Sequence, residues 1–218
     1  MKKVYVVGNA INYANFIYDA VLVDTLSEAD IVLFTGGEDV DPSFYGEKMH
    51  LTTYSNIVRD KQEKEVFECI KPSQLVVGIC RGSQFLCVMN GGKLVQHCNN
   101  HGIFETHPIL FEETDEIYEI TSTHHQMQYP YNLNEEDYTL TAKSLFKRSS
   151  IYEGGGIDIK TILSNGEPEI VIYHKENKPR CIAIQGHPEY MRKEAPIVAV
   201  LNELIDNNLN IVYNNENN

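Results

Sequence analysis

The sequence predicts an α/β fold in which helices cover a layered sheet, and two patterns along the chain carry this prediction. Short runs of β-branched and aliphatic residues recur, each bounded by Gly, Asn or Asp, as is typical of buried strands. Amphipathic helical patterns lie between several of these runs. Because strands and helices alternate along the chain, we expect the layered architecture of an α/β domain.

The individual elements follow in chain order. The expected strands are Val4–Val7, Val21–Val23, Ile31–Phe34, Leu75–Ile79, Ile170–Tyr173 and Cys181–Ile184. The clearest expected helices are Arg59–Ile70, Gly82–Asn90 and Ala195–Ile205. Pro196 suits the first turn of the last helix, where a proline leaves no hydrogen bond unmade. The segment Ile11–Asp19 offers one further, short helix.

The middle of the chain, from about Gly102 to Gly166, is less regular and is rich in Glu, Thr, Tyr and Gly. It is expected to form a small antiparallel excursion with loops. A length of 218 residues suits a single domain, which we assign to residues 1–213. The Asn-rich residues 214–218 are expected to form a disordered tail.

Composition excludes several classes of partner. A net charge of −13 and the absence of a basic stripe argue against nucleic acid. No run approaches the roughly 18 apolar residues of a membrane span, and Gly8-Asn9 ends the first apolar run too early for a signal peptide. The five cysteines are odd in number and lack a Cys-x-x-Cys pair, which suits a reducing compartment. We therefore expect a cytoplasmic protein.

Cys80 lies where the apolar run Leu75–Ile79 passes directly into a helical pattern. This is the arrangement of a nucleophile elbow, a sharp turn that needs small residues on both sides of the nucleophile. Gly78 and Gly82 supply them. A thiol at a helix N-terminus also feels the positive end of the helix dipole, which favours the thiolate. The sequence therefore predicts that Cys80 is a nucleophile.

The other cysteines have no such context. A free cysteine is most often a small buried apolar residue, and this is the interpretation we give to Cys69, Cys87, Cys98 and Cys181.

His187 and Glu189 follow the apolar run Cys181–Ile184, two residues apart. The carboxyl ends of strands in an open α/β sheet are where ligands bind. A thiol nucleophile needs a base, and the base needs a third group that fixes its tautomer. We expect His187 to be the base and Glu189 the group that orients it, with Pro188 stiffening the backbone between them.

A glycine pair, Gly36-Gly37, ends another buried run, Ile31–Phe34. Backbone N–H groups at such a turn can stabilise the oxyanion of a tetrahedral intermediate. The backbone N–H groups of Gly37 and Arg81 are the expected oxyanion hole. The segment from His97 to His101 could in principle bind zinc, but it offers three ligands without a fourth, and we expect no metal and no cofactor.

With these pieces in order, the sequence resembles the class I glutamine amidotransferase superfamily across the whole chain. Within it, the closest resemblance is to the γ-glutamyl hydrolase branch, including γ-glutamyl-γ-aminobutyrate hydrolases. The motifs that carry this resemblance are Phe34–Glu47, Ile79–Gln84 and Gly91–Leu94. The resemblance implies a doubly wound, mostly parallel, flavodoxin-like sheet and a Cys-His-Glu triad formed by Cys80, His187 and Glu189.

The resemblance also implies a set of substrate-binding residues. Gln84 matches the family's glutamine that holds the amino-acid end of the glutamyl group, and Ser122–Gln126 resembles its Asn-Ser-x-His-x-Gln loop, with Thr123 as a departure. The expected contacts are Gly36, Gln84, His125 and Gln126. Arg81 after the cysteine is typical of the hydrolase branch.

Together these features predict cysteine-dependent hydrolysis of a γ-glutamyl amide through a glutamyl thioester, releasing glutamate and an amine. The alternative is a glutaminase subunit that supplies ammonia from glutamine to a separate synthetase. A binding module that keeps the fold without catalysis is the third possibility. The region before Ile31 is short for the hydrolase branch, so we expect a more open pocket and a leaving amine other than γ-aminobutyrate.

Overall fold

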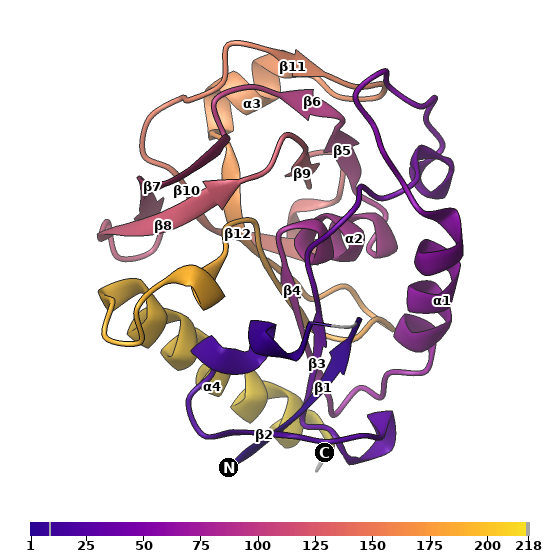
Figure 1. Cartoon of the computed structure of the whole chain (residues 1–218), viewed down its shortest axis with the longest axis vertical. Helices are drawn as coiled ribbons and strands as arrows, with labels where there is room; N and C mark the ends of the chain where they lie inside the picture. The colour runs from indigo at the N-terminus through magenta and orange to yellow at the C-terminus, as the bar shows by residue number, and fades with distance from the viewer. Residues whose placement is uncertain (9, 217–218) are drawn as a thin grey trace.

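A nine-stranded sheet runs through the molecule (Figure 1). The computed structural model describes residues 1–8 and 10–216, without the side chains of residues 103, 104, 215 and 216. In spatial order the strands are β2 (Ala20–Leu22), β1 (Lys2–Val7), β3 (Ile31–Phe34), β4 (Leu75–Ile79), β13 (Cys181–Ile184), β12 (Pro168–Tyr173), β10 (Tyr138–Ser144), β7 (Gly102–Phe111) and β8 (Ile117–Thr123).

The sheet has a parallel and an antiparallel part. Strands β2, β1, β3, β4 and β13 pair in parallel, and β12, β10, β7 and β8 continue the same sheet in antiparallel pairs. The predicted α/β fold is confirmed, and the antiparallel excursion is an extension of the main sheet. Two small sheets lie outside it, formed by β5 (Lys93–Val95) with β9 (Met127–Tyr129) and by β6 (His97–Cys98) with β11 (Tyr152–Glu153).

The helices lie on both faces of the sheet. They are α1 (Ile57–Glu68), α2 (Arg81–Met89), α3 (Ile159–Asn165) and α4 (Pro196–Glu216), with 3₁₀ turns η1 (Ile11–Phe16), η2 (Leu26–Glu28), η3 (Pro42–Tyr45), η4 (Glu135–Asp137) and η5 (Pro188–Tyr190). The expected helix at Ile11–Asp19 is the 3₁₀ turn η1. Helix α4 passes its expected end at Ile205, because Leu209 and Val212 continue its buried stripe. Residues 214–216 of the expected tail are therefore helical, and residues 217 and 218 lie outside the described part.

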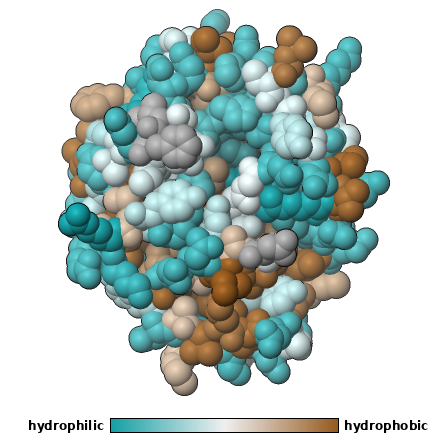
Figure 2. All heavy atoms as spheres, viewed as in Figure 1, coloured by the Kyte–Doolittle hydropathy of each residue, from teal (hydrophilic) through white to brown (hydrophobic). Residues whose placement is uncertain are grey.

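A hydrophobic core lies on each face of the main sheet, because alternate residues of each strand face opposite sides. Ile31 and Leu33 of β3 belong to the core that contains α4, whereas Val32 and Phe34 belong to the core that contains α1 and α2. The central strands are consequently buried on both faces, as their continuous apolar runs predict. On the face shown in Figure 2, hydrophilic residues cover most of the surface and apolar residues gather in the lower half.

No helix in the described ranges is long and apolar enough to cross a membrane. All five cysteines are free. Cys87, Cys98 and Cys181 are buried, as expected, but Cys69 is exposed, which corrects the expectation for that residue. Cys69 follows the last residue of α1, where the chain leaves the core-facing side of the helix.

Candidate active site

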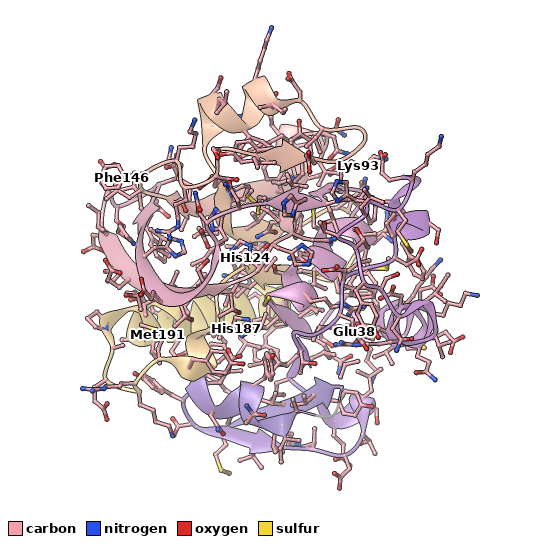
Figure 3. All side chains as sticks on the ribbon, turned by 45° about the horizontal axis from the view of Figure 1, so that its top comes forward. Glu38, Lys93, His124, Phe146, His187 and Met191 are labelled. Atoms are coloured by element: carbon pink, nitrogen blue, oxygen red, sulfur yellow. The ribbon has the colours of Figure 1, made fainter. Side chains whose placement is uncertain are left out.

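Three strand ends meet on one edge of the sheet. The glycine pair follows β3, Cys80 follows β4 and His187 follows β13, and these strands are neighbours in the parallel part. The order of the strands reverses between β1 and β3, and ligands of open α/β sheets bind at such a switch point. Figure 3 shows His187 and His124 toward the middle of the molecule, with Glu38 to one side.

Cys80 has the backbone of a nucleophile elbow. Its φ of 52° and ψ of −109° are strained for a residue with a side chain. The turn is held by hydrogen bonds: the Cys80 N–H donates to Ile184 O at 2.8 Å, and its carbonyl accepts from the Ser83 N–H at 3.0 Å. A Cβ atom at Gly78 would lie 2.6 Å from the carbonyl carbon of Gly82. The backbones of Gly78 and Gly82 thus approach too closely for a side chain at position 78, as expected for a sharp turn around Cys80.

His187 connects Cys80 to Glu189. Its Nδ1 lies 2.6 Å from Glu189 Oε1, and its imidazole lies close enough to the Cys80 thiol for the two groups to interact electrostatically. Burial alone would lower the pKa of His187, but the hydrogen bonds and charges of Cys80 and Glu189 outweigh it and raise the pKa to about 10. The geometry thus favours a charged imidazolium between the sulfur and the carboxylate.

Several residues that the sequence did not single out hold His187 in place. Thr121 Oγ1 donates to His187 O at 2.7 Å and accepts from the His187 N–H at 3.2 Å. Tyr190 stacks on the imidazole, with ring centroids 4.7 Å apart, and Tyr13 lies 6.0 Å away on another side. Burial and then the charge of Glu189 raise the pKa of Tyr13, so this hydroxyl stays neutral. A helical or strand pattern cannot show the contacts of Thr121 and Tyr13 with His187, because they join distant segments.

Gly36 and Gly37 form the turn after β3. Gly37 has a φ of 136°, which favours glycine, and it lines a pocket together with Cys80 and Arg81. A Cβ atom at Gly36 would lie 2.6 Å from the Tyr13 hydroxyl and 3.4 Å from His187 Cε1. The turn therefore needs glycine at both positions, for different reasons.

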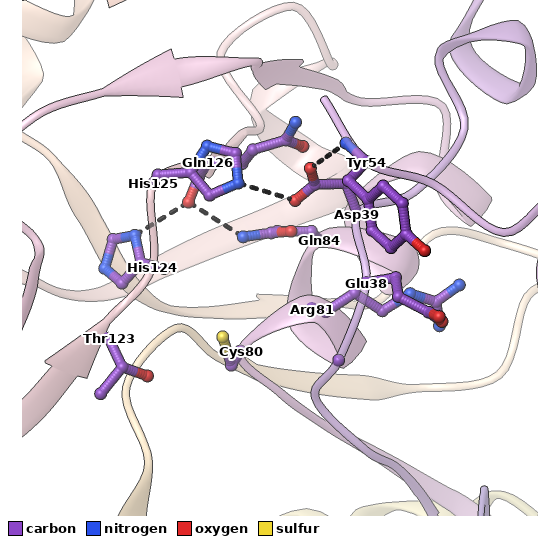
Figure 4. Close-up of a pocket in the computed structure, with 11 residues that line it drawn as sticks. Glu38, Asp39, Tyr54, Cys80, Arg81, Gln84, Thr123, His124, His125 and Gln126 are labelled. Carbon is purple, nitrogen blue, oxygen red and sulfur yellow. Dashed lines mark hydrogen bonds and ion pairs between the residues drawn. The ribbon is translucent and has the colours of Figure 1, made fainter. Parts of the chain in front are cut away.

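The pocket has a volume of about 180 Å³ and brings most of the predicted residues together (Figure 4). Its lining includes Gly37, Cys80, Arg81, Gln84, His125 and Gln126. Gly36 instead lines a neighbouring cavity of about 620 Å³, on the α1 side of the glycine turn. His187 and Glu189 are not among the residues that line this pocket.

The wall opposite Cys80 is a loop tied to helix α2. The Gln84 side chain donates to Gln126 O at 2.9 Å, and His124 Nδ1 lies 2.8 Å from the same oxygen (Figure 4). The Gln126 side chain donates to Thr53 Oγ1 at 3.2 Å. Gln84 and Gln126 therefore hold the loop in place.

His125 lies at the rim of the pocket beside a carboxylate. Its Nε2 lies 3.2 Å from Asp39 Oδ1, and this hydrogen bond raises the pKa of His125. Asp39 is fixed in turn by the Tyr54 N–H, which donates to its other oxygen at 2.8 Å. The rim thus offers a hydrogen-bonded His125–Asp39 pair next to the pocket.

The histidines of the His97–His101 segment, the one candidate for zinc in the sequence, separate in the fold. His97 stacks on His50, with ring centroids 5.7 Å apart. His101 joins His107 and Glu169 in a buried group whose ligand atoms lie within 4.8 Å of one another. Glu169 Oε1 already pairs with His107 Nε2 at 2.7 Å and accepts from the Ser144 hydroxyl at 2.9 Å. We therefore assign this group to the hydrogen-bonded interior of the antiparallel part.

Comparison with known proteins identifies a family that this chain matches. Residues 10–189 match the sequence model of the family described as Peptidase C26. Among curated proteins, the glutamine amidotransferase-like protein YvdE of Lactococcus lactis subsp. lactis is 28% identical over 173 residues, which span 75% of this chain and 67% of that protein. A glutamine amidotransferase of Mycobacterium tuberculosis is 31% identical over 120 residues, 46% of this chain and 39% of that protein. The matches thus span between about two fifths and two thirds of these relatives.

Two solved structures share the fold. A protein of Thermoplasma acidophilum described as one subunit of a GMP synthase superposes with a TM-score of 0.61 at 16% identity, covering 100% of this chain and 96% of that one. A glutamine amidotransferase of Thermotoga maritima superposes with a TM-score of 0.53 at 16% identity, covering 86% of this chain and 76% of that one. At this identity the likeness concerns the fold of the sheet and its helices.

Proposed function

The chain belongs to the Peptidase C26 family, with a class I glutamine amidotransferase-like fold, and from this premise we propose that it hydrolyses a γ-glutamyl amide through a thioester on Cys80. One observation carries the proposal. The imidazole of His187 interacts with Cys80, and His187 Nδ1 lies 2.6 Å from Glu189 Oε1. A nucleophile, a base and an orienting carboxylate in this order are what acyl transfer through cysteine requires.

The first half of the reaction forms the thioester. The Cys80 sulfur attacks the γ-carbonyl carbon, and the oxyanion accepts hydrogen bonds from the backbone N–H groups of Gly37 and Arg81. His187, charged because Cys80 and Glu189 raise its pKa, donates its proton to the amide nitrogen. The C–N bond then breaks and the amine leaves, with the glutamyl group bonded to sulfur.

The second half releases glutamate. Neutral His187 takes a proton from a water molecule, and the resulting hydroxide attacks the thioester carbon. The same two N–H groups stabilise the second oxyanion. When the C–S bond breaks, the thiolate and the imidazolium are regenerated together, so no external acid, oxidant or metal is consumed.

We further propose that the enzyme acts alone on a γ-glutamyl amine and does not supply ammonia to a synthetase. The proposed catalytic residues all belong to this chain: the glycine turn lines the pocket with Cys80, His187 pairs with Glu189, and Gln84 binds the pocket wall. This supports a hydrolase that acts alone. The Thermoplasma protein that shares the fold is described as part of a synthase, which favours the second candidate, an ammonia-donating glutaminase.

A panel assay tests the proposal. The isolated protein is given a series of γ-glutamyl amines and free glutamine, and glutamate release is measured, with the Cys80→Ser variant as the matched control. We expect turnover of at least one γ-glutamyl amine that disappears in the variant. Turnover that survives in Cys80→Ser, or no glutamate from any compound, would contradict the proposed hydrolysis.

A further inference from the structure

Arg59 of α1 lies against the carbonyl side of the glycine turn. Its Nη2 donates to Gly36 O at 3.0 Å and to Thr35 O at 3.3 Å, and its Nε donates to Glu63 Oε1 at 2.8 Å. Nη2 bonds to both consecutive carbonyls while the Nε–Glu63 hydrogen bond fixes the plane of the rigid guanidinium, so Arg59 restrains the two peptide planes. Arg59 thus determines how the turn after β3 is oriented.

The peptide bond transmits this orientation to the pocket. Gly36 O and the Gly37 N–H belong to one planar peptide unit, and in a trans peptide the C=O and N–H point in opposite directions. No described peptide bond is cis. Arg59 binds the carbonyl side of this unit, and Gly37 lines the pocket with Cys80 on the other side. The Gly37 N–H is therefore directed away from Arg59, toward the pocket.

We propose that Arg59 is a positioning residue that orients and polarises the Gly37 N–H as an oxyanion donor for Cys80. The positive charge at Gly36 O withdraws electron density through the peptide unit and makes the Gly37 N–H a stronger donor. Donors held in place before the reaction stabilise an oxyanion without reorganisation. Because it concerns acyl transfer by Cys80, this inference rests on the proposed function.

Gly37 itself supports the assignment. A Cβ atom at this position would overlap Arg59 Nη1 and would lie 3.4 Å from the guanidinium carbon. Arg59 therefore occupies the space that a side chain at position 37 would need. The absence of a side chain at Gly37 allows the guanidinium to approach the turn this closely.

Glu63 couples Arg59 to the second expected donor. Its Oε1 accepts from Arg59, and its Oε2 pairs with Arg81 Nη1, while Asp60 Oδ1 pairs with Arg81 Nη2. The Arg81 side chain is 2% exposed. Arg59, Glu63, Asp60 and Arg81 thus form a cluster of paired charges that ties the β3 turn to the first residue of α2, whose backbone N–H is the other expected oxyanion donor.

Two reactions of the Cys80 thiol distinguish an effect of Arg59 on the oxyanion from an effect on the nucleophilicity of the sulfur. Acylation by 4-nitrophenyl acetate passes through an oxyanion: the sulfur bonds to the carbonyl carbon and 4-nitrophenolate leaves. Alkylation by iodoacetamide passes through none: the sulfur bonds to an sp³ carbon and iodide leaves. Both rates are measured on the full chain for wild type, Arg59→Met, Arg59→Lys and the matched control Lys64→Met. Lys64 lies on the same helix, and its ion-pair partner among the described residues is the exposed Glu68 of α1.

We expect Arg59→Met to slow acylation at least about 10-fold while alkylation stays within about 2-fold, since removing an oxyanion donor outright costs about 100- to 1,000-fold. Arg59→Lys keeps the positive charge but lacks the planar guanidinium, so its acylation rate should lie between those of wild type and Arg59→Met. Lys64→Met should match wild type in both reactions. Equal losses in both reactions, or unchanged acylation in Arg59→Met, would overturn the assignment.

Chemical rescue of Arg59→Ala provides a second test in case Arg59→Met folds poorly. Arg59 lines the cavity of about 620 Å³ beside the turn, so an ethylguanidinium ion can reach the space left by Arg59→Ala. Its addition should restore acylation and leave alkylation unchanged, and no restoration in a folded Arg59→Ala protein counts against the role. If γ-glutamyl amides are not turned over but this contrast holds, the proposed substrate fails and the role of Arg59 stands. Wild-type acylation no faster than in Cys80→Ser would overturn the role of Arg59.

Discussion

A side chain at Gly82 would overlap the carbonyl oxygen of Phe34 and would lie 2.8 Å from its carbonyl carbon. Gly82 is the second residue of α2, and Phe34 is the last residue of the neighbouring strand β3. The first turn of the helix can therefore approach the backbone of β3 only because residue 82 is glycine. This approach places Cys80 beside the glycine turn that follows Phe34.

Gly82→Ala should accordingly destabilise the fold by more than about 2 kcal/mol, because backbone atoms on both sides must move. Gly102→Ala is the matched control: its nearest non-neighbouring atom would be His124 O at 3.7 Å, an ordinary contact. Urea unfolding of both variants measures the difference. Similar midpoints for the two variants would show that the turn has room that the structure does not indicate.

The strain at Cys80 predicts an inverted preference between glycine and alanine. With φ at 52°, residue 80 should favour glycine, so Cys80→Gly should be about 1 kcal/mol more stable than Cys80→Ala. At Cys87, inside the same helix, the order should reverse by about 1 kcal/mol. Both pairs are compared by urea unfolding. The same order at both positions would contradict a strained elbow.

The central strands, and the strand ends at which the proposed triad residues lie, could be predicted because their signals are local. Ile31–Phe34, Leu75–Ile79 and Cys181–Ile184 match β3, β4 and β13. The nucleophile with its two glycines and the His-Pro-Glu segment each lie within a few residues. What these motifs need from the rest of the fold is only that the strand ends meet, and an open α/β sheet provides that.

The supporting residues could not be predicted in the same way. Arg59, Glu63 and Thr121 act through contacts with segments far away in the sequence. One signal was present: Asp60 and Glu63 precede Phe67 at helical spacing, and all three are buried in α1. Two acids on the apolar stripe of a helix indicate a buried cation, and here it is Arg81.

The antiparallel part was hard to predict for a related reason. Its interior holds polar residues, including His107, Glu167 and Glu169, which pair with one another or with nearby side chains. Buried polar residues interrupt the alternation of apolar and polar side chains on which strand prediction depends. The strands β7, β8 and β10 therefore looked irregular in sequence, although they belong to the main sheet.

Loss of His187 and loss of Glu189 should have different effects on Cys80. His187→Ala should slow iodoacetamide alkylation at neutral pH at least about 10-fold, because the thiolate loses its cationic partner. Glu189→Gln should keep partial activity, since an amide can still accept from Nδ1 but no longer stabilises the charge. Alkylation rates and glutamate release are measured together. Equal alkylation in wild type and both variants would contradict the pairing.

The raised pKa of His187 predicts a pH dependence of stability. A group whose pKa rises from 6.5 to about 10 on folding stabilises the folded state fully below about 6.5 and loses that contribution as pH rises through about 10. The difference in unfolding free energy between wild type and His187→Gln should therefore shrink as pH is raised from about 7 to about 10.

His174→Gln is the control for this measurement. Burial lowers the pKa of His174, so its imidazole is neutral above pH ~7 in both the folded and the unfolded protein. The difference in unfolding free energy between wild type and His174→Gln should therefore not change with pH in this range. Urea unfolding at several pH values gives both differences. A flat difference for His187→Gln would mean that the imidazole is not held charged in the folded protein.

The preference between substrates separates a hydrolase from an ammonia donor. A donor subunit is expected to stay idle until its synthetase docks, because ammonia released into water is lost. In this chain Arg59 already holds the glycine turn, and His187 already contacts Cys80 and Glu189. We expect the isolated protein to turn over some γ-glutamyl amine at least ~100-fold better in kcat/KM than glutamine, a preference of roughly 2.7 kcal/mol at the transition state.

Contacts with the leaving amine must supply that preference, since the glutamyl part is the same in both substrates. The rim of the pocket offers Glu38, Asp39 and Tyr54 for such contacts. Tyr54→Ala should then reduce kcat/KM for the best γ-glutamyl amine and leave the value for glutamine nearly unchanged, as glutamine has no group that reaches the rim. If the panel of γ-glutamyl amines gives no turnover, while an added ATP-dependent ligase switches on glutamine hydrolysis, Cys80 belongs to an ammonia-donating glutaminase instead.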